Sequence, residues 1–130
     1  MGGEELFVNI SSKMASLWQK LRNKKFRDAF VASQFKRSIP FQITAIRKKR
    51  DWSQVQLAKA ANVTQGVISR AENPDYGNLT FNSVLRIAAG LDVAVVIEFV
   101  PFSRLLKIFD NRSEDFESQT FEQEDRILSE

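Results

Sequence analysis

Residues 52–74 read WSQVQLAKAANVTQGVISRAENP and contain the signals for two short helices joined by a tight turn. Ser53 can cap the first helix, because its hydroxyl accepts a hydrogen bond from an amide of the first helical turn. Asn62 suits the turn, since asparagine adopts a left-handed conformation at low cost. Thr64 can cap a second helix that runs to about Glu72. Each helix has an apolar side, formed by Val55, Leu57, Ala58 and Ala61 in the first and by Val67, Ile68 and Ala71 in the second.

The second of these helices has a polar side that can meet a partner surface. The residues on that side are Gln65, Gly66, Ser69 and Arg70. A helix of this size fits the major groove of DNA, where its side chains can reach the edges of the bases. The pattern therefore predicts a helix-turn-helix.

The segment from Phe41 to Leu91 resembles the DNA-binding domain of the Xre family, which includes lambda repressor and Cro. The residues that carry the resemblance are Ile46-Arg47, Trp52-Ser53-Gln54, Leu57-Ala58, Val63, Thr64-Gln65, Ile68-Ser69-Arg70, Glu72-Asn73 and the segment from Thr80 to Leu91. Within that family the chain looks most like the regulators that serve as antitoxins in toxin–antitoxin operons, a likeness to which FRDAFVASQFKRSIPFQITAIRKKRDWSQ and VPFSRLL both contribute. The resemblance implies a mainly α-helical fold, a lambda-repressor-like helix-turn-helix bundle.

The resemblance assigns base reading to Gln65, Gly66, Ser69 and Arg70. A glutamine can pair with N6 and N7 of adenine and an arginine with O6 and N7 of guanine, each contact giving about 1–3 kcal/mol of discrimination. Gly66 departs from the family pattern, which has a longer polar side chain there. Candidates for contacts with the DNA backbone are Arg47, Lys48, Gln54, Thr64, Asn78 and Thr80. The alternatives are a capping-turn role for Gln54 and plain surface positions for Gln65 and Arg70. We interpret Trp52, Glu72 and Tyr76 as structural residues.

Apolar spacing predicts further helices around this motif. Met14, Leu17, Trp18 and Leu21 follow i, i+3, i+4 and i+7, and a second helical segment begins near Asn23. Phe26, Phe30 and Phe35 in that segment could stack on bases, but their helical spacing favours a core or an interface. A third helix begins at Ser38-Ile39-Pro40, because proline is tolerated in a first turn. We expect a total of five helices between about residues 13 and 90, if the split N-terminal region is counted conservatively as one, and the last is capped by Thr80 and closed by Gly90 at its C′ position.

After residue 92 the apolar residues no longer follow the helical spacing of the preceding segments. Val93 to Val100, VAVVIEFV, is β-branched and apolar, which predicts a strand. A lone strand leaves its backbone groups unsatisfied, so it must pair with Leu6–Ile10 or with the same strand of a second subunit. The resemblance implies the second pairing, a two-fold dimer with Val93, Val95, Val96, Ile97 and Phe99 in its interface. Phe102 to Phe109 follows as a short amphipathic helix.

The distribution of charge separates the body of the chain from its end. Residues 1–109 hold 17 Lys and Arg against 8 Asp and Glu, a net charge of +9, and residues 110–130 hold 2 against 8, a net charge of −6. A basic body beside a helix-turn-helix favours a surface that faces phosphates. The acidic end is interpreted as a flexible tail. The predicted organisation is an N-terminal helical extension (1–38), the Xre-type domain (39–91), a dimerisation strand and short helix (92–109) and the tail (110–130).

The composition excludes several functional classes. The chain has no cysteine and no histidine, so thiol chemistry, disulfides and imidazole bases are ruled out. No nucleophile is paired with a base and no glycine-rich phosphate loop occurs, so we expect neither an enzyme nor a bound cofactor or metal. The sequence has no apolar run long enough to span a membrane and no secretory signal at its N-terminus, which predicts a cytoplasmic protein.

Three functions fit these observations. The first is a dimeric, sequence-specific DNA-binding transcriptional regulator, a repressor on a palindromic operator of double-stranded DNA, which could also be the antitoxin of a toxin–antitoxin pair. The alternative is a protein-interaction module whose main role is to neutralise a partner toxin, with DNA binding secondary. In the third, the acidic tail folds back on the basic face and mimics DNA.

Overall fold

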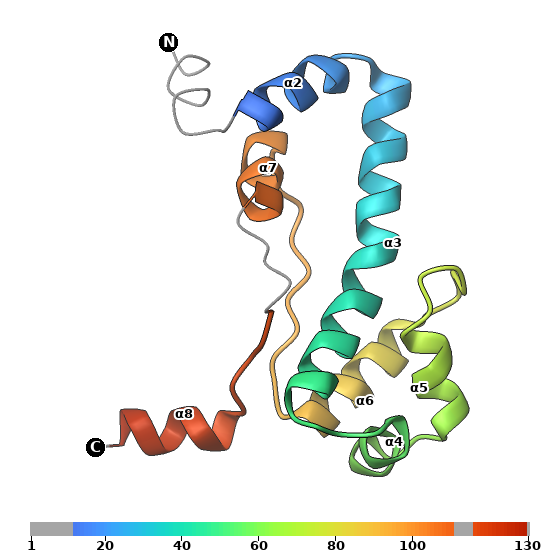
Figure 1. Ribbon diagram of the computed structural model, residues 1–130, viewed down its shortest axis with the longest axis vertical. Helices are drawn as coiled ribbons and strands as arrows, with labels where there is room; N and C mark the ends of the chain where they lie inside the picture. The colour runs from blue at the N-terminus through green and yellow to red at the C-terminus, as the bar shows by residue number, and fades with distance from the viewer. Residues whose placement is uncertain (1–11, 111–115, 130) are drawn as a thin grey trace. The chain divides into compact units, whose positions relative to one another are not determined.

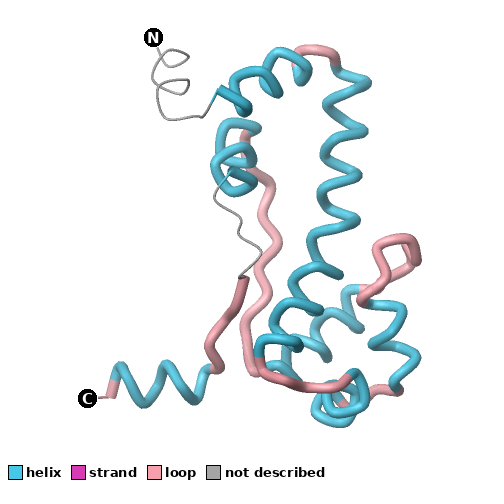
Figure 2. Tube along the Cα trace, in the orientation of Figure 1, coloured by secondary structure: helices cyan, strands magenta, loops and turns pink. Residues whose placement is uncertain are grey.

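The computed structural model describes residues 12–110 and 116–129, and the regular secondary structure of these residues is helical throughout (Figures 1 and 2). The helices are α2 (Ser12–Leu21), α3 (Lys24–Lys49), α4 (Gln54–Ala61), α5 (Gln65–Ala71), α6 (Phe81–Leu91), α7 (Phe102–Asp110) and α8 (Phe121–Leu128). The number of helices between about residues 13 and 90, α2 to α6, is the five that were expected, but their division in the N-terminal half differs. The described residues divide into two compact units: a first unit of 12–34 and 97–110, and a second unit of 35–96 and 116–129.

Helix α3 continues through Pro40, where the sequence predicted a boundary between two helices. That prediction is wrong, since the two predicted segments form one helix of 26 residues. An interior proline removes one hydrogen bond and crowds the preceding turn, which usually bends or ends a helix. Here Pro40 is buried, and Ile43 and Ile46 in the following turns are core residues only 5% exposed. We attribute the continuity of α3 to this burial, which anchors its second half.

The local signals around α4 and α5 act as predicted. Ser53 accepts a hydrogen bond from the amide of Gln56, whose side chain accepts one in return from the amide of Ser53, a complete capping box. Asn62 ends α4 in the left-handed conformation with φ 55°. Thr64 caps α5 and Thr80 caps α6 through their side chains. One expectation fails, because Val55 is 59% exposed and lies outside the apolar side of α4.

Gly90 has a different role from the one predicted. It lies inside α6, and Asp92 takes the left-handed position after the helix, with φ 57°. A Cβ atom on Gly90 would lie 2.7 Å from the Cα and N atoms of Ala61. Glycine is therefore needed because the backbones of α4 and α6 approach closely, and not because the chain turns there.

The second unit has one hydrophobic core, to which α3, α4, α5 and α6 each contribute. Leu57, Ile68 and Ile87 are at most 1% exposed and come from α4, α5 and α6. The buried members of this core are Ile43, Ile46, Leu57, Ala58, Ile68, Ala71, Ile87 and Leu91. Trp52 packs against it from the junction of α3 and α4, as expected. The core thus fixes α5 against α4 and α6.

The first unit is built around α2, the beginning of α3 and α7. Met14, Leu21 and Leu106 form its buried core, with Leu106 from the predicted amphipathic helix completely buried. Phe30 packs edge-on against Phe109, with ring centroids 6.0 Å apart. The partly buried residues around this core are Leu17, Trp18, Phe30, Phe102 and Phe109. Of the three phenylalanines that helical spacing assigned to a core or an interface, Phe30 packs in this core, whereas Phe26 and Phe35 are 38% and 58% exposed.

Residues 93–100 are extended but form no strand with any part of the chain that the structure describes. The predicted β element is therefore not found among the residues that the structure describes. An extended segment becomes a strand only when a neighbour exchanges hydrogen bonds with it, and the predicted partner Leu6–Ile10 lies outside the described residues. Val93 and Val95 are half-buried, whereas Val96, Ile97 and Phe99 are exposed.

Residues 116–129 of the acidic end contain a helix, α8, where we expected a flexible tail. Thr120 and Gln123 form a second capping box, which starts α8. Phe116 packs against the core of the second unit and against Phe41, with ring centroids 6.2 Å apart. The average composition of residues 110–130 did not indicate that Phe116 packs against the core or that Thr120 caps a helix.

Candidate nucleic-acid interface

A short turn joins α4 to α5, and its residue Val63 packs against the hydrophobic core of the second unit. The amide of Val63 donates to the carbonyl of Ala58 at 3.0 Å, which closes the end of α4. Ile68 and Ala71 are fully buried, so the opposite side of α5 faces outward. Gln65, Ser69 and Arg70 are exposed on α5, and Gly66 is half-buried. The four predicted base-reading positions therefore share one short helix.

A buried ion pair lies behind α5. Arg47 donates from Nε to Oε2 of Glu72 at 2.6 Å and from Nη2 to Oε1 at 2.9 Å, and its Nη1 donates to the carbonyl of Trp52 at 2.8 Å. The two side chains are 11% and 7% exposed. The hydrogen bonds with Glu72 raise the pKa of Arg47 above its usual value.

This pairing removes Arg47 from the predicted set of phosphate contacts. A buried carboxylate needs its cation, because an unpaired charge away from water is costly. Arg47 is engaged by Glu72 and by the carbonyl of Trp52, so we do not carry it forward as a phosphate contact. Glu72 is structural, as the sequence indicated.

A chain of side-chain hydrogen bonds connects this pair to α5. Gln54 donates from Nε2 to Oε1 of Glu72 at 3.2 Å, and Gln65 donates from Nε2 to Oε1 of Gln54 at 3.4 Å. A carboxylate only accepts hydrogen bonds, so Glu72 sets which way the amide of Gln54 points. Gln54 in turn orients Gln65. The second N–H of the Gln65 amide and its oxygen are left for a ligand such as an adenine edge.

Arg70 lies along the outer side of α5 beside Gly66. Its guanidinium carbon is 5.8 Å from the centre of the Tyr76 ring, a cation–π contact. A Cβ atom on Gly66 would lie 3.3 Å from Nη1 of Arg70. Glycine at this position therefore leaves room for the arginine head group. Tyr76, expected to be a packing residue, packs under that group and is 37% exposed.

Residues 43–96 match the protein-family model described as Helix-turn-helix. This segment is a helix-turn-helix domain. The match supports the lambda-repressor-like domain that the sequence predicted, and it includes α4, α5, α6 and the end of α3 from Ile43 onward. It does not extend to the antitoxin likeness. No curated protein and no solved structure matches the chain.

The basic run at the end of α3 divides into two faces of the helix. Arg47 and Arg50 lie three residues apart, so they share one side of α3. Arg50 donates to the carbonyls of Leu91 at 2.6 Å and Ser118 at 3.0 Å, and burial lowers its pKa. Lys48 and Lys49 are exposed on the other side. Lys49 is a candidate that the sequence analysis missed, although the helical period would have separated it from the arginines.

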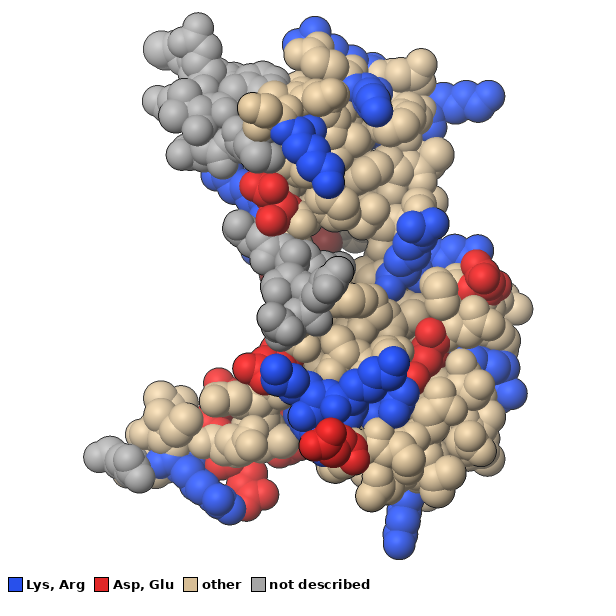
Figure 3. Space-filling model, viewed as in Figure 1, with Lys and Arg blue, Asp and Glu red and all other residues tan. Residues whose placement is uncertain are grey.

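The remaining predicted backbone contacts lie on the surface of the helix-turn-helix domain. Thr64 and Thr80 cap α5 and α6, and both side chains are exposed. Asn78 is exposed in the loop before α6. Figure 3 shows Lys and Arg side chains over much of the face in view, with acidic side chains among them and along α8. The charge pattern therefore allows phosphate contacts at separate points rather than over one uniform basic face.

The acidic tail is anchored at the end of α6 rather than at α5. The amide of Phe121 donates to the carbonyl of Asp92 at 2.9 Å, and that of Glu122 donates to Oδ2 of Asp92 at 3.2 Å. Together with the bond from Arg50 to Ser118, these contacts place the described part of the tail, residues 116–129, beside the end of α6. These hydrogen bonds do not support a tail that folds over α5.

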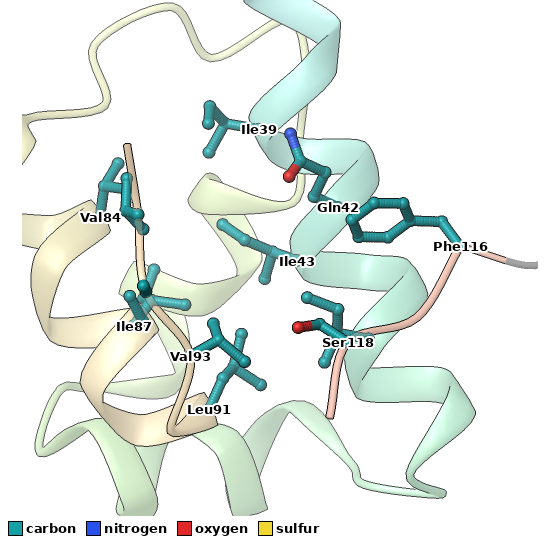
Figure 4. Close-up of a pocket in the computed structure, with 13 residues that line it drawn as sticks. Ile39, Gln42, Ile43, Val84, Ile87, Leu91, Val93, Phe116 and Ser118 are labelled. Carbon is teal, nitrogen blue, oxygen red and sulfur yellow. The ribbon is translucent and has the colours of Figure 1, made fainter. Parts of the chain in front are cut away.

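The helix-turn-helix domain also contains a small apolar cavity of about 120 Å³ (Figure 4). Side chains from α3, α6, residues 93–95 and the tail line it, including Ile43, Ile87, Val93 and Phe116. No residue of α4 or α5 lines it. The cavity is therefore separate from the candidate DNA-binding face. No described helix is both long and apolar enough to cross a membrane.

Proposed function

We propose that this protein is a sequence-specific DNA-binding transcriptional regulator that places α5 in the major groove. The observation that carries the proposal is the hydrogen-bonded chain from Glu72 through Gln54 to Gln65. A side chain that is already oriented loses less conformational entropy when it binds. This arrangement prepares Gln65 to read a base.

The residues divide into base readers and backbone contacts. Gln65 reads adenine through its amide and Arg70 reads guanine through its guanidinium, while Ser69 supplies a hydroxyl beside them. Gly66 lets α5 approach the base edges closely. The contacts with phosphates come from Lys48, Gln54, Thr64, Asn78 and Thr80, and we add Lys49.

A single copy of α5 offers few base contacts, so a dimer on a palindromic operator gives the specificity that a regulator needs. Half-sites about one helical turn apart match a two-fold dimer. The segment that supports this pairing is 93–100, because Val96, Ile97 and Phe99 are exposed and its backbone is extended. Val93 and Val95 complete the proposed contact. Repression follows if the operator overlaps a promoter.

The test is selection of bound fragments from random double-stranded DNA, followed by fluorescence anisotropy on the selected site. Gln65→Ala and Arg70→Ala should each lower the affinity for that site by roughly tenfold, corresponding to about 1–3 kcal/mol, and should relax the preference at one base position. Lys59→Ala, an exposed change on α4, is the matched control. Failure to enrich any sequence at moderate salt would count against the proposal.

A second candidate function is that of an antitoxin, in which the chain also binds a partner toxin. The observation in its favour is the apolar surface on the first unit, where Phe26, Val31 and Ile108 are 38–43% exposed. Co-expression with the neighbouring reading frame tests this role. A stable complex and rescued growth support it, whereas the absence of both removes it and leaves a stand-alone regulator.

A further inference from the structure

Helix α8 has an apolar side without a covering surface in the structure. Phe121, Ile127 and Leu128 are 68%, 60% and 83% exposed, and α8 has no buried residue. A helix of eight residues gains too few hydrogen bonds to be stable alone in water. The capping box at Thr120 and the pair between Arg126 and Glu122 favour the helix, but each such contact contributes only tenths of a kcal/mol to about 1 kcal/mol. We therefore expect another apolar surface to cover Phe121, Ile127 and Leu128 and to stabilise the helix.

Helix α6 has a second apolar row beside its core side. Phe81 and Leu85 lie one turn apart and are 70% and 58% exposed, and Ala89 continues the row one turn later. The core side of α6, with Ile87 and Leu91, is buried. Large apolar residues in a contiguous exposed row are typical of an interaction surface.

The two rows meet at the end of α6. A hollow in the surface there is lined by Ala89, Val93, Ala94 and, from α8, Phe121 and Glu124. The hydrogen bonds to Asp92 hold the first turn of α8 at this point, and in Figure 1 α8 continues away from α6. The chain thus presents both apolar rows on the second unit and leaves both exposed.

We propose that α8 of one protomer packs on the Phe81–Leu85 row of α6 in a second copy of the chain, and that the second copy does the same in return. A two-fold contact of this kind is self-complementary, since each chain supplies both surfaces. It buries both exposed rows at once. Any partner that lacks these surfaces would cover one row and leave the other in water.

The charges on the two helices agree with this pairing. Helix α8 holds Glu122, Glu124 and Asp125 against Arg126, and the sole charged residue of α6 is Arg86. The acidic side chains of α8 would face a positive charge on α6, and opposite charges across an interface favour that pairing over one between two acidic helices. No residue of α5 takes part, so the interface leaves the candidate DNA-binding face free, and it lies apart from the exposed residues Val96, Ile97 and Phe99.

The test is sedimentation equilibrium of the full chain and of two double variants, Phe81→Asp with Leu85→Asp, and Ile127→Asp with Leu128→Asp. Each double variant should weaken self-association at least about tenfold, because a charged group would replace an apolar contact in both copies of the interface. All four side chains are more than half exposed, so the fold should persist, as circular dichroism would verify. Val55→Asp, at a 59% exposed position of α4, is the control and should leave association unchanged.

A mixture of the two double variants identifies the reciprocal contact. In a heterodimer, the unchanged α8 of the Phe81/Leu85 variant can pack on the unchanged α6 of the Ile127/Leu128 variant. In either homodimer, every α8–α6 contact contains one changed helix. The mixture should therefore associate more tightly than either variant alone. A chain that remains monomeric, unchanged association of both variants, or a mixture no tighter than its components would overturn the proposal. These readouts need no DNA, so they are independent of the proposed regulatory function.

Discussion

Arg47 and Glu72, 25 residues apart in sequence, form a two-pronged buried ion pair that joins the end of α3 to the end of α5. The carboxylate of Glu72 also accepts a hydrogen bond from Gln54, so one buried group holds two helices and one polar side chain in place. Arg47 neutralises a glutamate at the C-cap of α5, the helix that we propose to face DNA. The pair therefore links the stability of the domain to the arrangement of the proposed reading surface.

The first prediction concerns the stability that this pair provides. Arg47→Ala should lower the free energy of unfolding by about 3–5 kcal/mol, because Glu72 would remain as an uncompensated buried charge. Urea denaturation followed by circular dichroism measures the change. Since hydrogen bonding raises the pKa of Arg47, the guanidinium stays charged throughout the neutral and mildly alkaline range. Its contribution is thus present below its unfolded pKa and is lost only as the pH rises through the higher folded value.

The exposed pair of Lys24 and Asp28 gives the matched control. Its side chains are 75% and 62% exposed, so Asp28→Ala should cost less than about 1 kcal/mol. Equal losses from Arg47→Ala and Asp28→Ala would show that burial of the first pair has no energetic consequence.

The second prediction concerns the hydrogen bond between Gln54 and Gln65. Removing Gln54 takes away the group that orients Gln65, so Gln54→Ala should weaken discrimination at the base that Gln65 reads. A double-mutant cycle with Gln65→Ala, measured by anisotropy on the selected site, should give a coupling of at least about 0.5 kcal/mol. Additive losses would indicate that the two side chains act separately.

Lys48→Ala distinguishes this effect from a general loss of DNA contacts. An exposed lysine that touches a phosphate contributes equally to every sequence, so the variant should bind all sites more weakly and lower the salt slope by about one. A change in base preference in the lysine variant would contradict the proposed division of roles.

Local chemistry explains why so much of α4, α5 and α6 could be predicted. Ser53, Asn62, Thr64 and Thr80 act within three residues of their own positions, so the sequence alone contains both partners of each cap. The apolar periods of α2 and α7 are equally local. Such elements follow from spacing and side-chain type.

Several of the failures depend on partners that are distant in sequence. The ion pair of Arg47 joins residues 25 positions apart, and Gly90 is required by a backbone on another helix. Pro40 lies within a helix whose following turns are held by the core, and Phe116 finds its place against Phe41. Composition and period describe one segment at a time, so they could not reveal these contacts.

The third prediction compares two glycines within helices. Gly90→Ala should destabilise the domain by about 1–3 kcal/mol, because the new Cβ would meet backbone atoms of Ala61 at 2.7 Å. Gly66→Ala meets only the flexible end of Arg70 at 3.3 Å, so it should stabilise the domain by up to about 1 kcal/mol through helix propensity. Urea denaturation of both variants measures the difference. The same sign of change in both would contradict the close approach at Gly90.

The fourth prediction concerns the anchor of the tail. Phe116 lines the apolar cavity with Ile43 and Val93 and packs against Phe41, so it covers one side of the core. Phe116→Ala should lower the free energy of unfolding by at least about 1 kcal/mol, less than the 3–5 kcal/mol typical of a fully buried phenylalanine because its side chain is half-buried. Glu117→Ala, at the exposed neighbouring position, should change stability by less than about 0.5 kcal/mol. Thermal unfolding at matched concentrations measures both, and equal stability of the two variants would show that the tail does not contribute to the core.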